Sequence, residues 1–232
     1  MDYEKWWNVA AVYTDRTVRM GAAQALYLLQ DGMTECLSAF GCSNIDLREK
    51  YDAFWVIVKA KVRFDRFPAW NERVRLVMRP ETVGKLRMEL KSELYDESGA
   101  LLLAAVQEMC ALDRSRRRPI KIAAFGLPEG AEATAFSYLG AQDATVCYEV
   151  PARGQTIDMS GHVNNVAYVR LALDAYESAF WAEHPPKTLE AHYLKESPEG
   201  SLLSVCKNDF ESGAFFRIMR EGQPVFEMKV EY

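Results

Sequence analysis

The sequence predicts an α+β protein built from two similar halves, each with a long helix followed by an antiparallel sheet. Apolar residues recur at steps of three or four in residues 21–40 and again in residues 165–181, as expected for helices that bury one face. Both segments are followed by stretches in which apolar and polar residues alternate, as in half-buried strands. This repeated order of elements indicates a duplicated unit.

In the first half, the predicted helix at 21–40 is followed by a polar loop at about 44–50. Alternation then predicts strands through residues 56–64 and 74–78, and it is clearest at 85–94, where we expect one face to be exposed to water. The run Asp96-Glu97-Ser98-Gly99 predicts a hairpin turn. Residues 101–112 are more continuously apolar, which favours a central strand covered on both faces.

In the second half, the helix at about 165–181 precedes strands predicted at 189–195, 202–209 and 214–220. A turn at 221–224 leads to a final strand at 225–232, where Phe226, Met228 and Val230 alternate with charged residues. The join between the halves is expected at about 114–144. Asp15–Met20 precedes the first helix in the same way that Asp158–Val163 precedes the second.

The bulk composition limits the classes of function. With 232 residues and 49% hydrophobic content, the chain can bury a substantial core as one large domain or two smaller ones, while its net charge of −5 argues against a general nucleic-acid binder. Its five cysteines have no CxxC spacing, so buried thiols are favoured over a zinc site or a disulfide framework. No signal segment or run of 18 apolar residues is present, which predicts a cytoplasmic protein without a membrane span.

Residues 158–165 are the main clue to chemistry. Asp158, Ser160, His162, Asn164 and Asn165 place an acid, a hydroxyl, an imidazole and two amides directly before a helical pattern. A His at this position can exchange protons near neutral pH, and the backbone N–H groups of a helix N-terminus favour developing negative charge. The alternative is that these side chains have only a structural role as helix caps, since Asp and Asn are common at that position. The chemical interpretation is hydrolysis of an acyl bond.

The pattern Asp-x-x-x-His-Val-Asn-Asn before a hydrophobic helix resembles the signature of the acyl-acyl carrier protein thioesterases. Residues 12–17 resemble the N-terminal part of that family, and Tyr193-Leu194-Lys195-Glu196-Ser197 resembles its Tyr-Arg-Arg-Glu-Cys stretch. The resemblance implies a tandem, or double, hotdog fold. We expect the N-terminal half, residues 1–130, to bind the acyl tail in an apolar tunnel between its helix and sheet, and residues 131–232 to be catalytic, because Arg19 stands in the first half where His162 stands in the second.

The resemblance also assigns roles to residues. The family's acid, Asn and His correspond to Asp158, Ser160 and His162, and its water-activating Glu corresponds to Glu196. The expected nucleophile is water, activated by Glu196 or Asp158 together with His162. Ser160 departs from the Asn, and it is expected to bind the carbonyl oxygen with helix N–H groups. Ser197 replaces the Cys, which argues against a covalent Cys–His route. The expected substrate-binding residues are Asn164, Asn165 and Ser197.

Two other assignments of catalytic residues are disfavoured. Ser160 as a nucleophile activated by His162 lacks the Gly-x-Ser-x-Gly motif of a nucleophile elbow. His192, on the same predicted strand as Glu196, is more often a packed or surface histidine than a catalyst.

The expected partner is an acyl carrier protein that carries the fatty acyl group. The segment 114–121 contains five positive charges, and it either docks the acidic carrier or is a solvated linker. Its basic residues are Arg114, Arg116, Arg117, Arg118 and Lys121. No metal or organic cofactor is implied, and a homodimer is an open alternative. Competing functions are acyl-coenzyme A hydrolysis and non-catalytic acyl binding.

Overall fold

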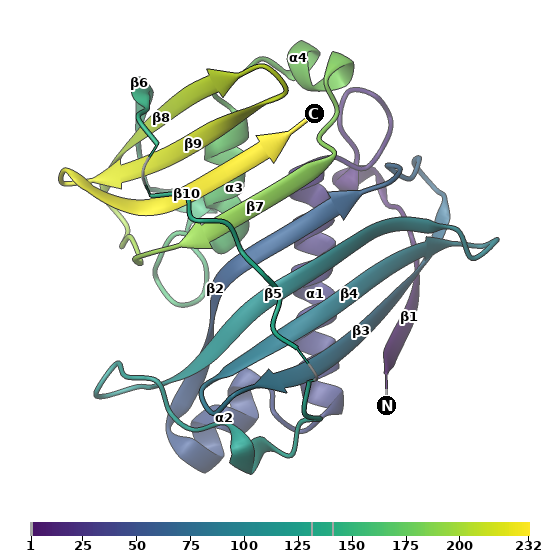
Figure 1. Cartoon of the computed structure of the whole chain (residues 1–232), viewed down its shortest axis with the longest axis vertical. Coiled ribbons are helices and arrows are strands. Elements are labelled where there is room, and N and C mark those ends of the chain that lie inside the picture. The colour runs from purple at the N-terminus through teal and green to yellow at the C-terminus, as the bar shows by residue number, and fades with distance from the viewer. Residues whose placement is uncertain (1, 131, 141) are drawn as a thin grey trace. The chain divides into compact units, whose positions relative to one another are not determined.

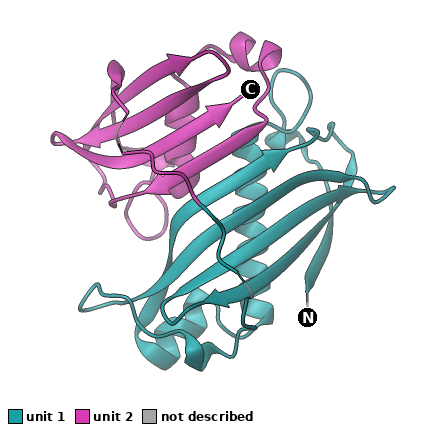
Figure 2. Ribbon diagram, in the orientation of Figure 1, with its two compact units in different colours: residues 1–135 teal, residues 136–232 magenta. Residues whose placement is uncertain are grey.

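The computed structural model describes residues 2–130, 132–140 and 142–232. It divides into two compact units, Met1–Ala135 (unit 1) and Phe136–Tyr232 (unit 2), shown in Figure 2. In each unit a helix lies against an antiparallel sheet (Figure 1). The α+β class and the tandem hotdog arrangement predicted from the sequence are confirmed.

Unit 1 begins with a strand that the sequence analysis did not predict. Its elements in chain order are β1 (Tyr3–Asn8), the 3-10 helix η1 (Ala11–Tyr13), α1 (Ala22–Ala39), α2 (Asn44–Tyr51), β2 (Ala53–Phe64), β3 (Arg73–Val83), β4 (Arg87–Asp96), β5 (Leu101–Asp113) and η2 (Ala123–Phe125). The strands pair antiparallel in the order β1-β3-β4-β5-β2. The hairpin predicted at Asp96–Gly99 joins β4 to β5.

Helix α1 lies on the sheet of unit 1 and approaches β3 closely at Gly32. A Cβ added there would lie 2.4 Å from Leu76 Cδ2 and 3.0 Å from Met78 Cε, both on β3. The absence of a side chain at this point lets the helix approach the strand closely. Leu28 and Leu29 on the same helix are fully buried, so this face of α1 forms the core of unit 1.

Unit 2 repeats the plan with shorter elements. They are β6 (Thr145–Pro151), the 3-10 helix η3 (Gly154–Thr156), α3 (Asn165–Leu173), α4 (Ser178–Glu183), β7 (Thr188–Tyr193), β8 (Leu202–Phe210), β9 (Gly213–Arg220) and β10 (Gln223–Glu231). The strands pair antiparallel in the order β7-β10-β9-β8-β6. Helix α3 covers one face, where the ring of Tyr168 stacks on Phe226 with centroids 5.4 Å apart.

The predicted single helix at 165–181 is wrong, because α3 ends at Leu173 and α4 begins at Ser178. Carbonyl groups at the C-terminus of a helix need partners from outside the helix. The hydroxyl of Tyr148 donates to the carbonyl of Leu171, and Trp181 Nε1 donates to the carbonyl of Leu173 at 2.9 Å. These side chains satisfy the last turn of α3.

The predicted polar loop at 44–50 is also wrong, because these residues form α2. Ser43 caps the helix by accepting from Asp46 N, while the Asp46 carboxylate accepts from Ser43 N at 2.9 Å. This reciprocal arrangement is a capping box. The short helix has little amphipathic pattern, since Leu47 is its buried residue, and periodicity therefore did not reveal it.

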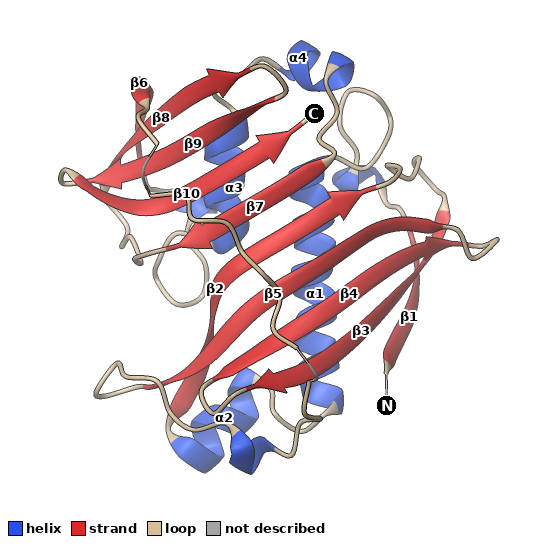
Figure 3. Cartoon of the chain, in the orientation of Figure 1, coloured by secondary structure: helices blue, strands red, loops and turns tan. Residues whose placement is uncertain are grey.

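One face of the strand at 85–94 was expected to be exposed, yet Glu89 is only 1% exposed. The segment after η2 covers it, because Thr134 donates from both its backbone nitrogen and its hydroxyl to the Glu89 carboxylate, each at 2.7 Å. In unit 2, Ser137 binds the buried Glu190 in the same two-point manner, at 2.6 and 3.1 Å. Figure 3 shows this connecting segment as a loop.

The two units share a hydrogen-bonding pattern where the chain leaves the sheet after β2 and after β7. After β2, the backbone nitrogens of Asp65 and Arg66 both donate to the carbonyl of Leu102. After β7, those of Leu194 and Lys195 both donate to the carbonyl of Val225. This identical bifurcated anchor supports the duplication inferred from the sequence.

No helix in the described ranges is long and apolar enough to cross a membrane.

Candidate active site

The loop that precedes α3, here called the second helix-start loop (residues 158–164), is a tight turn organised by Asp158. The Asp158 carboxylate accepts from the backbone nitrogen of Ser160 at 2.8 Å and from the Ser160 hydroxyl. The backbone of Asp158 pairs with Gly161 and with His162, each at 3.0 Å. Gly161 has a φ of +80°, a conformation that glycine adopts without strain. The turn therefore holds His162 in a defined position.

His162 lies between Ser160 and Glu196. Its Nδ1 is 3.3 Å from Ser160 Oγ, and its Nε2 is 3.6 Å from Glu196 Oε2. Because the Ser160 hydroxyl gives its hydrogen to Asp158, its oxygen is left to accept from Nδ1–H. This assignment puts the imidazole lone pair on Nε2, facing Glu196. The four side chains thus form a row of polar groups from Asp158 to Glu196.

The segment that carries Glu196 is anchored through its backbone. Arg220 Nη1 donates to the carbonyl of Glu196 at 2.6 Å, and Val163 N donates to the carbonyl of Ser197 at 2.9 Å. His162 and Pro198 form an isolated antiparallel bridge. Residues 34 positions apart in the sequence are in this way brought to one site. The Glu196 side chain is 43% exposed and the His162 side chain 28%, so the pair is open to solvent and to a substrate.

Ser197 is fully buried beside Tyr168, and no described group meets hydrogen-bond geometry with its hydroxyl. Burial raises the pKa of the Tyr168 hydroxyl, while the nearby Ser197 and Arg220 act in the opposite direction. Tyr168 therefore remains protonated at neutral pH, and its hydroxyl lies 3.5 Å from the carbonyl of Lys195. No pattern in the sequence indicated a role in the site for Tyr168 or Arg220.

The two asparagines have different surroundings. Asn164 is the N-cap of α3, and its side-chain oxygen accepts from Val166 N at 2.8 Å. Asn165 is the first residue of the helix and is half-buried. The capping interpretation thus describes Asn164 in the structure. A contact of either residue with substrate remains a prediction.

The basic residues at 114–121 lie in unit 1, after β5, and they are all exposed. Arg114 pairs with Asp52 at 3.2 Å, and the guanidinium of Arg117 lies 5.1 Å from the centroid of the Phe54 ring. These contacts hold part of the segment on its own unit, and docking of a carrier remains a prediction.

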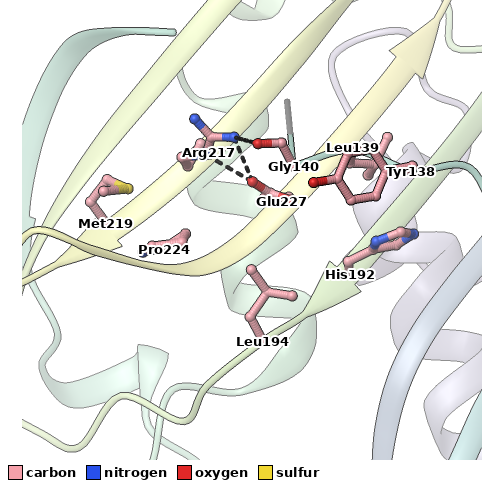
Figure 4. A pocket seen from close by; sticks show the side chains of 9 residues that line it. All are labelled: Tyr138, Leu139, Gly140, His192, Leu194, Arg217, Met219, Pro224 and Glu227. Carbon is pink, nitrogen blue, oxygen red and sulfur yellow. Dashed lines mark hydrogen bonds and ion pairs between the residues drawn. The ribbon is translucent and has the colours of Figure 1, made fainter. Parts of the chain in front are cut away.

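His192 belongs to a separate, buried group on the opposite face of the unit 2 sheet from α3. Its Nε2 lies 3.0 Å from Glu190 Oε1, and in the adjacent strands Glu227 binds Arg217 at 2.6 Å. His192, Arg217 and Glu227 are among the side chains that line an open pocket, shown in Figure 4. Its volume is about 430 Å³. The pocket is lined by Tyr138, Leu139, Gly140, His192, Leu194, Arg217, Met219, Pro224 and Glu227. Arg217 is already bound to Glu227 and to the carbonyls of Gly140 and Gln142.

Comparison with known families identifies both units. The sequence profile of the acyl-ACP thioesterase N-terminal domain matches residues 1–124, and that of the acyl-ACP thioesterase C-terminal domain matches residues 141–230. None of the curated proteins matches the chain by sequence.

Two of the similar solved structures cover nearly the whole chain, and a third covers about half of it. An acyl-ACP thioesterase from Bacteroides thetaiotaomicron matches with a TM-score of 0.89 at 19% identity, covering 99% of this chain and 97% of its own. A 12:0-ACP thioesterase from Umbellularia californica matches with a TM-score of 0.85 at 16% identity, over 99% and 96% of the two chains. A 1,4-dihydroxy-2-naphthoyl-CoA thioesterase from Synechocystis, 17% identical, covers 54% of this chain with 92% of its own, at a TM-score of 0.50.

Proposed function

The chain belongs to the acyl-ACP thioesterase family and is a hydrolase of fatty acyl thioesters, and we propose that its substrate is a fatty acyl group carried on acyl carrier protein. The products are a free fatty acid and the carrier thiol. The observation that carries the proposal is the chain of polar groups Asp158–Ser160–His162–Glu196 at the start of α3. The second helix-start loop and the segment 194–198 together form the active site.

Water is the proposed nucleophile. With a proton on Nδ1, both His162 Nε2 and the Glu196 carboxylate are acceptors, and their separation of 3.6 Å is too long for a direct hydrogen bond. A water molecule that donates one hydrogen to each acceptor has a lone pair available for attack on the thioester carbonyl carbon. General-base assistance of this type contributes about 10²- to 10⁴-fold to a rate. Asp158 acts on His162 through Ser160.

The attack forms a C–O bond and places negative charge on the carbonyl oxygen. Backbone N–H groups at the start of α3 are the proposed donors to that oxygen, because a helix N-terminus favours negative charge. Ser160 was expected to be a donor as well, but its hydrogen is committed to Asp158. We assign Ser160 instead to the orientation of His162. Collapse of the intermediate breaks the C–S bond. The proton that His162 or Glu196 took from the attacking water then passes to the sulfur of the leaving thiol.

The acyl tail is proposed to enter unit 1 between α1 and the sheet. In the structure this interior is filled by side chains, with Leu76 and Met78 against Gly32 and with Met33 and Met88 also buried. Methionine side chains rearrange at low cost because they are unbranched and flexible. Movement of these side chains would make room for a tail.

The basic segment 114–121 is proposed to attract the acidic carrier. Electrostatic complementarity accelerates encounter and is weakened by salt. Arg116 and Arg118 are exposed, and they can be reversed to Glu without removing the Arg114–Asp52 pair. The double reversal should raise KM more for an acyl carrier substrate than for an acyl-coenzyme A substrate.

The test is release of thiol and free fatty acid from acyl carrier protein and from coenzyme A thioesters of matched chain lengths. The proposal predicts turnover with a higher kcat/KM on the carrier. Higher kcat/KM on coenzyme A would assign the enzyme to the competing substrate. Tight binding of the acyl carrier without release of thiol would support a non-catalytic acyl-binding protein and contradict the proposal.

A further inference from the structure

Arg220 occupies a position at the end of β9 from which it reaches the backbone of Glu196. Neighbours along β9 alternate between the two faces of the sheet, with Arg217 on the pocket side and the buried Phe216 and Ile218 on the side of α3. Arg220 therefore lies on the α3 side, where its charge acts on the hydroxyl of Tyr168. Its Nη1 donates to the carbonyl of Glu196 at 2.6 Å.

β10 lies between β9 and β7 in the sheet, and it contains a bulge. The register between β9 and β10 shifts between Pro224 and Phe226, so Val225 is the extra residue. Its carbonyl accepts from both Leu194 and Lys195, which turns the chain out of β7 immediately before Glu196. A bulge of this type bends a strand and re-aims the residues beside it. Glu196 itself is therefore outside the ladder of the sheet.

Unit 1 contains the same bonding pattern with different residues. Its equivalent of Glu196 is Phe67, because Met20 N binds the carbonyl of Pro68 as Val163 N binds that of Ser197. The carbonyl of Phe67 is also held by a guanidinium, at 3.0 Å, but the donor is Arg19, which stands in the place of His162. In unit 2 the His side chain faces Glu196, and Arg220 supplies the guanidinium from another strand.

We propose that Arg220 is a positioning residue for the thioesterase reaction: it fixes the carbonyl of Glu196 so that the carboxylate faces His162. This inference rests on the proposed function of Glu196. Arg220 acts through Glu196 and does not itself contact the reacting atoms. Its loss should lower kcat by about 10- to 100-fold, because misplacement of a catalytic group by about 1 Å can have that effect. KM should change little.

The experiment compares Arg220→Met, which keeps an apolar stem but removes the donors, with Arg220→Lys, which keeps one donor group. The expected result is a kcat loss for Arg220→Met that Arg220→Lys partly restores. In the Glu196→Gln background, Arg220→Met should change kcat by less than about twofold, since residues that act as one unit are not additive. Glu221→Gln is the matched control, because Glu221 is 85% exposed and lies 3.9 Å from Arg220 Nε. It should retain wild-type kcat.

Two results overturn the inference: a kcat within about twofold of wild type for Arg220→Met, or losses for Arg220→Met and Glu196→Gln that multiply in the double variant. Should Arg220→Met lose its cooperative thermal unfolding, Arg220→Gln replaces it in the same comparison. A wild-type protein that releases no thiol contradicts the proposed function. An active wild type with an impaired Glu196→Gln and an unaffected Arg220→Met contradicts the role of Arg220 alone.

Discussion

The loop before α1 (residues 15–21, the first helix-start loop) and the second helix-start loop have the same backbone design but different side chains. Asp15 accepts from the backbone nitrogen and hydroxyl of Thr17, as Asp158 does from those of Ser160. Each acid's backbone N–H then pairs with the carbonyl four residues later, that of Arg19 or His162. The hydrogen bonds that the two loops share all hold the turn together. The turn is therefore a structural feature of the fold and occurs in both units.

The differences fall on the residues that could perform chemistry. Arg19 replaces His162 and Phe67 replaces Glu196, so the first site has neither an imidazole base nor a carboxylate opposite it. Phe67 stacks on Phe64 with centroids 4.7 Å apart. The same framework thus supports packing in unit 1 and a solvent-accessible polar chain in unit 2.

After the imidazole itself, the largest expected difference between the two sites concerns the carboxylate that faces it in unit 2. Glu196→Gln keeps the shape of the side chain but weakens its ability to accept a proton, and should lower kcat by about 10²- to 10³-fold. Phe67→Leu, the matched change in unit 1, should leave kcat near the wild-type value. Steady-state thiol release measures both, and a Glu196→Gln variant with normal kcat would remove Glu196 from the proposed mechanism.

A smaller effect is expected at the turn itself. Val18 corresponds to Gly161, yet it has a φ of +59°, which is strained for a β-branched residue. A Cβ at Gly161 would meet nothing within 4 Å, so a side chain there suffers from the backbone conformation alone. Gly161→Val should therefore destabilise the protein by about 1–2 kcal/mol, and Val18→Gly should be neutral or stabilising by up to about 1 kcal/mol. Equal thermal shifts of the same sign in both variants would contradict this account.

The smallest effect concerns acid stability. Arg66, beside Phe67, binds Glu72 and Asp96 and lowers the pKa of the Glu72 carboxyl. Because this pKa is lower in the folded state, the pair stabilises the protein above the unfolded value of about 4 and loses that contribution as the pH falls through the folded value. Denaturant unfolding should show a weaker loss of stability below about pH 4 in Glu72→Gln than in the wild type. An identical pH dependence in the two proteins would show that the pair has no such role.

Much of the fold was predictable because its helices and central strands bury one face with a regular period. β1 and β6 lie at the edges of their sheets, and their burial patterns are only partial, so they gave weak signals. The break after Leu173 depends on Tyr148 and Trp181, which reach the end of α3 from other elements. The buried Glu89 depends on Thr134, which is 45 residues away. Such long-range contacts leave no local pattern in the sequence.

The site was predictable to a different degree. The local cluster at 158–164 indicated chemistry by itself, because its polar groups are adjacent in the chain. Glu196 came only from a family resemblance, and the structure places it opposite His162. Arg220 could not be found from spacing, because its hydrogen bond joins residues on different elements that are 24 positions apart in the sequence.

We propose that the second helix-start loop performs the chemistry and that the first does not. The most direct measurement is kcat for release of thiol from one acyl carrier substrate by His162→Ala and by Arg19→Ala, each shown to unfold cooperatively. The account predicts that His162→Ala loses about 10³-fold or more, while Arg19→Ala stays within about twofold of wild type. Near-normal turnover by His162→Ala, or an equal loss in Arg19→Ala, would contradict it.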